Sequence, residues 1–474
     1  MHPGTHLTLE EDFRIQLQNY AHFHDPVTGL ANHILFRVSL RQMLSAAIAD
    51  GEEIAFLWVD VLNLRREYSI NGDEGVMRMV CMLADSLRPS VEPDELICRF
   101  SDRCFLLALK RDDNTGARLN AILQAASHRQ LLGSEGKPEL SAGVAYFPEH
   151  TNTAEDLIRF ASLAAVSASR SRNREPVTFT PNMNSALLHE RDLERDLRDA
   201  IKTGQLTLAY QPQVDLATGN IVGAECLTRW NHPVRGHVSP AQFIAVAEHS
   251  DLIDEIFNHS LHRLLSDVAA WRTEGVVLPL IAVNASPANV RHQDFVEIVK
   301  SELDLNPPGE TQLDVEVTES LLMDDEDLFI ERLNAVRSIG VQVSLDDFGT
   351  RYTGFNALQG LPLNTMKIDK CFIHGIDRSS QAQSLCRTMV TMATHLNLAT
   401  VAEGIENPGE LRILKELGCL AGQGYLFQRP VPSDQFLGFM REWPERKSNS
   451  EFASAFLSSD GNRSLDLDPL VGAA

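Results

Sequence analysis

The sequence predicts an α/β protein in which a smaller α/β sandwich precedes a parallel (β/α) barrel. Between residues 21 and 172, helix-like and strand-like segments alternate, as in a single α/β or α+β domain. Between residues 186 and 442, a short apolar run recurs, ends each time in a polar residue, and is followed by helical periodicity. The 474 residues are 43% hydrophobic and 23% charged, a composition that excludes wholesale disorder.

The charge balance narrows the classes of function. The chain has 42 Lys and Arg residues against 65 Asp and Glu residues, a net charge of −23 that argues against binding to DNA. The N-terminal residues 1–13 have neither a basic start nor an apolar core, and no apolar run reaches the ~18 residues of a membrane span. Seven scattered cysteines indicate reduced thiols, so we expect a cytoplasmic protein without a membrane segment.

The first segment, 21–172, opens with turn-forming residues at 24–29 and then shows helical spacing from Leu35 to Leu44. The apolar runs that follow predict strands, two of them forming a hairpin, and the small-residue pattern near the end predicts a helix. The expected elements are a strand at Ile54–Val59, a helix around Val76–Leu83, a hairpin at Leu96–Phe100 and Phe105–Leu109, a strand at Leu140–Phe147 and a helix at Ala154–Arg170.

Composition also sets the expected boundaries. Residues 1–20 form an N-terminal extension that could be one amphipathic helix, and the polar, proline-containing residues 173–189 form a linker that runs into a connecting helix. The second domain covers 190–442. The last residues, 443–474, are rich in Ser, Asp and Gly, and we expect a disordered tail there.

In the second domain, seven apolar runs end in polar residues. In a parallel barrel, the carboxyl ends of all strands meet at one mouth, so these side chains are expected to share one site. The residues concerned are Glu225, Asn284, Glu316, Asp346, Asp347, Lys367, Glu403 and Gln423.

Taken singly, each of these residues is better explained as a polar residue at the start of a loop. As a set, five carboxylates at one mouth would repel one another strongly unless cations lay among them. Oxygen ligands without His or Cys suit Mg²⁺ or Mn²⁺. Two such ions activate water and neutralise phosphate charge in phosphodiester hydrolysis, and a single lysine could orient or deprotonate that water.

The motifs within residues 190–440 resemble those of EAL-domain cyclic di-GMP phosphodiesterases. The name-giving motif reads Glu225-Cys226-Leu227, with Cys in place of Ala. The other matches, in chain order, are Tyr210–Gln213, Val283–Ser286, Glu316–Glu319, Asp346–Thr350, Lys367–Asp369, Ala402–Glu406 and Gln423–Tyr425. The resemblance implies a TIM-like (β/α)8 barrel that hydrolyses cyclic di-GMP to pGpG and forms a homodimer through the barrel.

The resemblance also implies a role for each matching residue. Two metal ions would be held by Glu225, Asn284, Glu316, Asp346 and Asp347, with Asp347 serving the second ion. Lys367 and Glu403, together with Glu225, would be the catalytic residues. Gln211, Leu227, Arg229 and Gln423 would contact the substrate, and Glu319 would position the loop after Asp347. We expect Trp230 to pack in the core.

One residue departs from the family pattern. Arg351 follows Thr350 where the family usually has Gly, and a glycine there permits a loop conformation that a side chain resists. We favour a tolerated surface substitution, although altered turnover is the alternative.

The first domain resembles GGDEF diguanylate cyclase domains, from Asp25–Asn32 and the strand that ends at Asp60. Its signature is lost, because Ser101–Phe105 reads Ser-Asp-Arg-Cys-Phe, with Arg103 and Cys104 in place of the two acids. Tyr68 stands at the guanine-reading position, Ser169 at a phosphate-binding position and Glu92 at the inhibitory site. A single remaining carboxylate cannot hold two Mg²⁺ ions, so we expect no cyclase activity.

Two readings of this domain stay open: a structural or dimerising platform, which we favour, and a GTP-binding activator. For the whole chain, the alternative to a hydrolase is a receptor that binds cyclic di-GMP without cleaving it and signals through protein contacts. Such receptors usually lose acids at the strand ends, and this chain keeps all of them.

Overall fold

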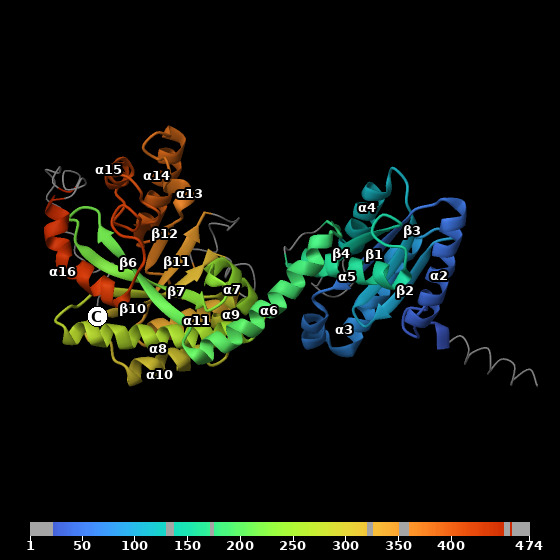
Figure 1. Ribbon diagram of the computed structural model, residues 1–474, viewed down its shortest axis with the longest axis horizontal. Helices are drawn as coiled ribbons and strands as arrows, with labels where there is room; N and C mark the ends of the chain where they lie inside the picture. Colours follow the sequence, from blue (N-terminus) through green and yellow to red (C-terminus); the bar gives the residue numbers. More distant parts are fainter. Residues whose placement is uncertain are drawn as a thin grey trace, which may run out of the picture. The chain divides into compact units, whose positions relative to one another are not determined.

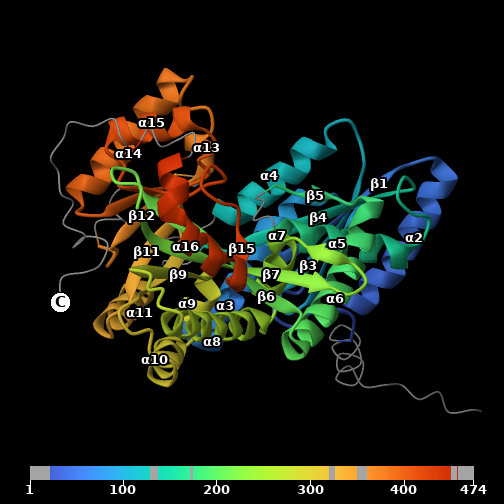
Figure 2. The ribbon, with the colours of Figure 1, turned by 60° about the vertical axis from the view of Figure 1, so that its left-hand side comes forward.

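The computed structural model describes residues 22–128, 137–170, 175–319, 326–349, 360–449 and 456. The chain divides into two units, residues 1–189 and 190–474, each with its own sheet and its own core (Figures 1 and 2). Within the described residues, none of the helices is both long and apolar enough to cross a membrane. The predicted extension at residues 1–20 lies outside the described residues.

The first unit contains a five-stranded sheet with the strand order β2-β3-β1-β4-β5. The central strand β1 pairs antiparallel with both β3 and β4, and β4 pairs parallel with β5. The strands are β1 (Ile54–Val61), β2 (Leu96–Ser101), β3 (Cys104–Lys110), β4 (Leu140–Phe147) and β5 (Val177–Thr178).

Four helices cover the two faces of this sheet. Alternate residues of β1 point to opposite faces, so Leu57 and Val59 join one apolar cluster while Ile54 and Phe56 join the other. The first cluster includes α3 (Leu64–Leu87) and α4 (Thr115–His128), and the second includes α2 (His33–Asp50) and α5 (Ala154–Arg170). The predicted α/β sandwich is confirmed, including the hairpin and the last helix.

The second unit contains a closed eight-stranded barrel with the order β6-β14-β13-β12-β11-β10-β9-β7, closed by the pairing of β6 with β7. The strands are β6 (Leu206–Asp215), β7 (Ile221–His232), β9 (Leu280–Ala285), β10 (Gln312–Thr318), β11 (Gln342–Phe348), β12 (Thr365–Ile368), β13 (Ala399–Ala402) and β14 (Ala421–Gly422). Two short strands extend it, β8 (Gly236–Val238) and β15 (Val431–Pro432). The (β/α)8 prediction is confirmed.

Helices surround the barrel and bury the outward residues of its strands. Val315 and Val343, for example, are fully buried in the same cluster as Phe329 and Leu333 of α11. These helices are α7 (Pro240–Glu248), α8 (Leu252–Thr273), α9 (Pro287–Arg291), α10 (Phe295–Leu305), α11 (Glu326–Ser338), α13 (Lys370–Ile373), α14 (Ser380–His395), α15 (Pro408–Leu417) and α16 (Ser433–Asn449). The core therefore lies mainly between strands and helices, and a smaller apolar cluster of strand residues, Val222, Ala399, Val401 and Ala421, is separate from it.

The strand directions differ from the prediction at one place. The strand β6 runs antiparallel to both of its barrel neighbours, β7 and β14. A two-stranded hairpin joins β6 to β7 through the turn at residues 215–220, which is the short connection that antiparallel strands allow. The barrel is thus not wholly parallel, because its first strand enters from the opposite end.

Two predicted boundary segments contain more regular structure than we expected. Part of the predicted linker 173–189 forms β5, which joins the first sheet, and the start of α6 (Pro181–Thr203). The predicted tail 443–474 begins inside α16, where Trp443 is buried and donates a hydrogen bond to the Gly219 carbonyl. Each unit therefore continues for several residues beyond the boundary that the polar composition of these segments had predicted.

Candidate functional site

The carboxyl ends of the parallel strands bring the predicted polar residues to one mouth of the barrel. Asn284, Glu316 and Lys367 lie within the last three residues of β9, β10 and β12. Glu403 and Gln423 directly follow β13 and β14. Strand pairing fixes their heights, since Glu316 is the register partner of Asn284 and Lys367 is the partner of Val401, two residues before Glu403.

The sequence predicted Glu225 at a strand end, but the structure places it elsewhere. It sits in the middle of β7, which continues to His232, and its register partner on β6 is Gln211. Leu227 and Arg229 follow at alternate positions, so they are on the same face of β7 as Glu225. Gln211, Leu227 and Arg229 therefore line a wall that rises above the carboxylates.

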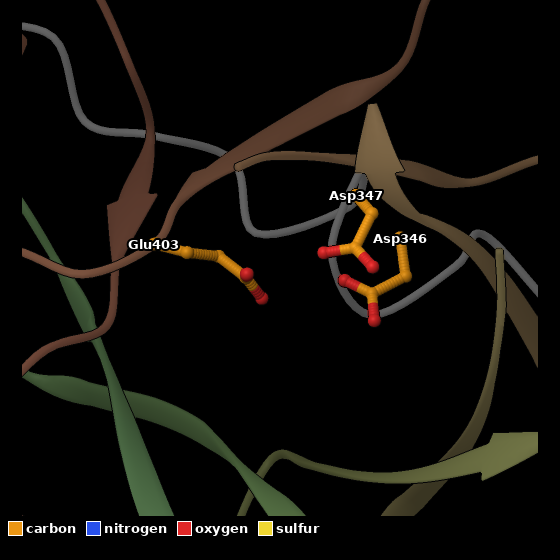
Figure 3. A group of neighbouring side chains, drawn as sticks. All are labelled: Asp346, Asp347 and Glu403. Carbon is orange, nitrogen blue, oxygen red and sulfur yellow. The ribbon is translucent and has the colours of Figure 1, made fainter. Parts of the chain in front are cut away.

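Two consecutive acids reach the same space because β11 is irregular. Side chains normally alternate between the faces of a strand, yet Asp346 and Asp347 both approach Glu403 (Figure 3). The register with β12 shifts between Leu345 and Phe348, and Asp347 has a positive φ of 55°, a left-handed conformation that Asp tolerates better than most residues. This bulge turns the second acid toward the mouth.

The ammonium group of Lys367 lies at the centre of the cluster. The side chain is only 1% exposed, and its Nζ lies 2.7 Å from Glu403 Oε1, 2.8 Å from Glu316 Oε2, 3.1 Å from Asp346 Oδ1 and 3.3 Å from Glu225 Oε2. Four strands thus deliver carboxylates to a single buried cation. The predicted residues are brought together as expected.

Amide side chains orient Glu225 from two sides. Asn284 Nδ2 donates to Glu225 Oε1 over 2.8 Å, and Gln423 Nε2 donates to Glu225 Oε2 over 2.6 Å. The same Gln423 amide also donates to Gln211 Oε1 over 3.0 Å, while Gln211 Nε2 donates to the Gln428 carbonyl. Glu225 is therefore held in one orientation before any ligand arrives.

The cluster has more negative than positive charge. Burial, opposed by Lys367, raises the pKa of Glu403 to about 8, and burial with the neighbouring Asp346 raises the pKa of Asp347 to about 6. Burial also raises the pKa of Glu316 well above its usual range. The pKa of Glu225 is lowered instead, because Lys367 and the amides of Gln423 and Asn284 outweigh the effect of burial. Several carboxylates therefore lack a compensating cation.

The donor set fits divalent cations. Asp346, Asp347 and Glu403 offer carboxylate oxygens that all lie within 4.8 Å of one another. Glu316 Oε1 is buried and has no hydrogen-bond partner in the described part of the chain. The five carboxylates and one ammonium carry a formal charge of −5 + 1 = −4, which two divalent ions would balance. Oxygen ligands of this kind suit Mg²⁺ or Mn²⁺.

Three other predicted positions can be placed. Glu319 is buried, and the Gly349 amide donates to its Oε2 over 3.3 Å, so it contacts the chain two residues after Asp347. Trp230 is fully buried and packs against Phe243 in the core, as expected. Arg351 lies outside the described residues.

The sequence reading missed a buried polar pair beneath the site. Ser344 Oγ donates to Asp314 Oδ2 over 2.5 Å, and both side chains are at most 2% exposed. Burial raises the pKa of Asp314 to about 6. The signal was present in the sequence, since Asp314 and Ser344 precede Glu316 and Asp346 by two residues and so share their faces of the strands.

In the first unit, the corresponding acid lies beside a basic side chain of the same hairpin. Asp60 on β1 is the register partner of Cys104 on β3, and Arg103 Nε lies 3.9 Å from Asp60 Oδ1. Burial raises the pKa of Asp60, and Arg103 opposes that shift. Tyr68, at the predicted guanine-reading position, is 55% exposed on α3. No second carboxylate takes the place that Arg103 and Cys104 fill in the hairpin.

The comparisons with known families match both units. The EAL domain family matches residues 194–430, and the diguanylate cyclase GGDEF domain family matches residues 22–175. The order is therefore GGDEF followed by EAL.

Relatives from bacteria have both units in the matched region. The chain is 29% identical over 425 residues to the cyclic di-GMP phosphodiesterase NbdA of Pseudomonas aeruginosa, which covers 89% of this chain and 54% of NbdA. It is 31% identical over 417 residues to MucR of the same organism, which is named a bifunctional diguanylate cyclase/cyclic di-GMP phosphodiesterase. This match covers 87% of this chain and 61% of MucR. The chain spans about half the length of the first curated relatives that it matches.

Among solved structures, the chain is similar to the EAL enzyme Bd1971 in its form bound to cAMP and cyclic di-GMP. The identity is 28% and the TM-score 0.51, covering 63% of this chain and 80% of that chain. The GGDEF-EAL part of Vibrio cholerae LapD, bound to cyclic di-GMP, has a TM-score of 0.54 at 18% identity, covering 87% of this chain and 98% of that chain, and shares the fold.

Proposed function

Since the chain belongs to the EAL-domain family and has a GGDEF-family domain before the barrel, we propose that it is a metal-dependent phosphodiesterase that hydrolyses cyclic di-GMP to pGpG. One observation carries the proposal. Four carboxylates from separate strands surround the buried Lys367 ammonium within 3.3 Å, and a fifth lies beside them. A cluster with this excess of negative charge suits bound cations and a phosphate ester.

The residues that would hold two Mg²⁺ or Mn²⁺ ions are Glu225, Asn284, Glu316, Asp346 and Asp347. When bound, the ions would supply Lewis-acid activation of a water molecule and neutralise charge on the phosphate. The free Oε1 of Glu316 and the bulge that turns Asp347 inward support this assignment within the described residues.

Lys367 and Glu403 form the pair that would orient and deprotonate the attacking water. Their side chains meet at 2.7 Å, and Glu403 lies at the edge of the cluster with 17% of its side chain exposed. The Glu403 carboxylate oxygens, placed against the Lys367 ammonium at the edge of the cluster, would accept the proton of that water.

The substrate would lie along the wall above the carboxylates. Arg229 provides a planar guanidinium that matches a phosphate, and Leu227 provides an apolar surface between Arg229 and Glu225. Gln211 and Gln423, which bond to each other, would present amide groups beside the scissile phosphate.

A second candidate function is a receptor that binds cyclic di-GMP without hydrolysing it. LapD, bound to cyclic di-GMP, shares the fold, so the fold alone does not separate the two functions. The complete set of acids favours hydrolysis, because binding a phosphodiester does not need five carboxylates. The phosphodiesterase names of the relatives NbdA and MucR support the same choice.

For the first unit, we propose a structural or regulatory role without cyclase activity. Arg103 and Cys104 stand where the family has two acids, and Arg103 places a positive charge 3.9 Å from the one remaining carboxylate, Asp60. GTP binding at this unit, and a homodimer formed through the barrel, stay predictions.

The deciding experiment incubates the full chain with cyclic di-GMP in Mg²⁺ or Mn²⁺ and follows pGpG by chromatography. We expect pGpG to form with Mg²⁺ and with Mn²⁺, and no pGpG to form when a chelator removes the metal ion. Tight binding without product would favour the receptor.

The same preparation with GTP in place of cyclic di-GMP tests the first unit. We expect no formation of cyclic di-GMP, and any measurable synthesis would contradict the proposed lack of cyclase activity in this domain. A parallel hydrolysis assay with and without GTP would show whether GTP activates the barrel.

A further inference from the structure

The rim segment, residues 423–429, follows β14 and begins at the carboxylate cluster, where Gln423 contacts Glu225. Gln423 points inward to Glu225, while Tyr425, two residues later, is 50% exposed. The Arg429 guanidinium lies over the Tyr425 ring, 4.0 Å from its centroid. An exposed aromatic ring with a cation on one face is therefore placed two residues from a predicted substrate contact.

This rim segment is held firmly by the backbone. A Cβ atom on Gly424 would collide with the carbonyl oxygen and amide nitrogen of Ile405, so only glycine permits the close approach. The Ile405 amide donates to the Gln423 carbonyl over 3.1 Å, and the Leu426 amide donates to the Ile405 carbonyl over 3.0 Å. Phe427 is buried in the core next to them. Tyr425 is thus presented on a fixed support.

The charge on Arg229 of the substrate wall responds to the same ring. Burial lowers the pKa of Arg229, and the negative forms of Glu225, Cys226 and Tyr425 oppose this shift.

We propose that Tyr425, supported by Arg429, is the stacking platform for one guanine base of the substrate and thereby a specificity-determining residue. The inference rests on the proposed function. The carboxylates and Lys367 can act on the phosphate and its water, but they offer no flat surface to a base. A half-exposed tyrosine does, and the guanidinium on one ring face limits its rotation, so stacking costs little side-chain entropy.

The test measures the kinetics of cyclic di-GMP hydrolysis by the full chain and by Tyr425→Leu, Tyr425→Phe and Arg429→Gln. Loss of a stacking surface weakens nucleotide binding by about tenfold or more. We expect Tyr425→Leu to raise KM by about tenfold with kcat within about twofold, Tyr425→Phe to keep the wild-type KM, and Arg429→Gln to raise KM by less than Tyr425→Leu. Phe23→Leu is the matched control, because Phe23 is an aromatic side chain exposed to 39% in the first unit, and it should leave KM unchanged.

The outcomes separate the two proposals. If wild-type protein yields no pGpG, the proposed function fails before Tyr425 is tested. If wild-type protein is active and Tyr425→Leu keeps the wild-type KM, or loses kcat instead, the stacking role is wrong. A wild-type KM in Tyr425→Leu together with an altered oligomeric state by light scattering would assign the exposed ring to a protein contact.

Discussion

Both units place an acid near the end of a strand, Glu316 on β10 and Asp60 on β1, but the charges around the two acids differ. In the barrel, Glu316 shares the single Lys367 ammonium with three other carboxylates. In the first unit, Asp60 has Arg103 to itself at 3.9 Å. An acid at a strand end is therefore not a metal site by itself. The number of uncompensated carboxylates around it decides whether cations are needed.

The comparison of the two acids predicts that the largest loss of activity follows from replacing Glu225. Replacing Glu225 by Ala removes an expected metal ligand and breaks hydrogen bonds from Asn284 and Gln423. Several kcal/mol of lost charge stabilisation corresponds to a fall in kcat of about a thousandfold. The measurement is pGpG formation at saturating cyclic di-GMP.

The control for this variant is Glu274→Ala, which removes a surface carboxylate paired with Arg441. Surface pairs contribute ~0.2–1 kcal/mol, so activity and stability should be nearly unchanged. A Glu225→Ala protein with more than a tenth of wild-type turnover would contradict the assigned role.

The second effect concerns stability without metal. Replacing Lys367 by Met leaves four carboxylates, of which Glu225 and Glu316 are buried, without their ammonium, which should lower the free energy of unfolding of the barrel by about 3–5 kcal/mol. Urea unfolding followed by tryptophan fluorescence reports this unit when Trp58 of the first unit is replaced by Phe in both proteins, since the other three tryptophans, Trp230, Trp271 and Trp443, all lie in the barrel unit. Added Mg²⁺ should recover part of the loss, by about 2.7 kcal/mol at a hundredfold excess over Kd.

Lys300→Met, on the exposed side of α10, is the control and should change stability by less than about 0.5 kcal/mol. Equal stability of Lys367→Met and the wild type in a chelator would mean that the carboxylates do not depend on Lys367.

A third, smaller effect compares two glycines, one in each unit. A Cβ atom on Gly424 would collide with the Ile405 backbone, and one on Gly143 would collide with the α5 backbone at Ala161 and Ala165. Each Gly→Ala change should destabilise its own unit by about 1–3 kcal/mol. Only Gly424→Ala should also raise KM, because it displaces Gln423 and Tyr425.

Thermal melting and hydrolysis kinetics measure the two properties separately. Gly438→Ala serves as the control, because a Cβ atom there meets no other atom within 4 Å and alanine favours the helix. A raised KM in Gly143→Ala at temperatures where it is folded would show that the first unit affects the barrel site directly.

The smallest effect is expected at Arg103. Its side chain is 69% exposed and 3.9 Å from Asp60, so Arg103→Ala should change the stability of the first unit by less than about 1 kcal/mol. It should produce no cyclic di-GMP from GTP, since one carboxylate is still too few. By contrast, Arg118→Ala removes the partner of the buried Glu95 and should cost several times more. Similar losses of stability in the two variants would mean that Arg103 interacts with Asp60 more strongly than the 3.9 Å between them indicates.

The sequence by itself determined the two folds and most members of the site. Apolar runs that end in polar residues are a local pattern, and parallel strands of a barrel bring such ends together whatever the loops between them do. Glu316, Lys367 and Gln423 were therefore predictable one strand at a time. The loss of the GGDEF acids was equally visible, because Arg103 and Cys104 stand in the hairpin itself.

The tertiary structure decided how these residues meet. The antiparallel entry of β6 puts Gln211 opposite Glu225, the bulge in β11 turns Asp347 inward, and barrel closure places Lys367 among carboxylates from four strands. Strand direction, register and closure depend on contacts between residues that are far apart in the chain. A local pattern names the side chains that reach the mouth, whereas only packing of the whole barrel fixes their distances and charges.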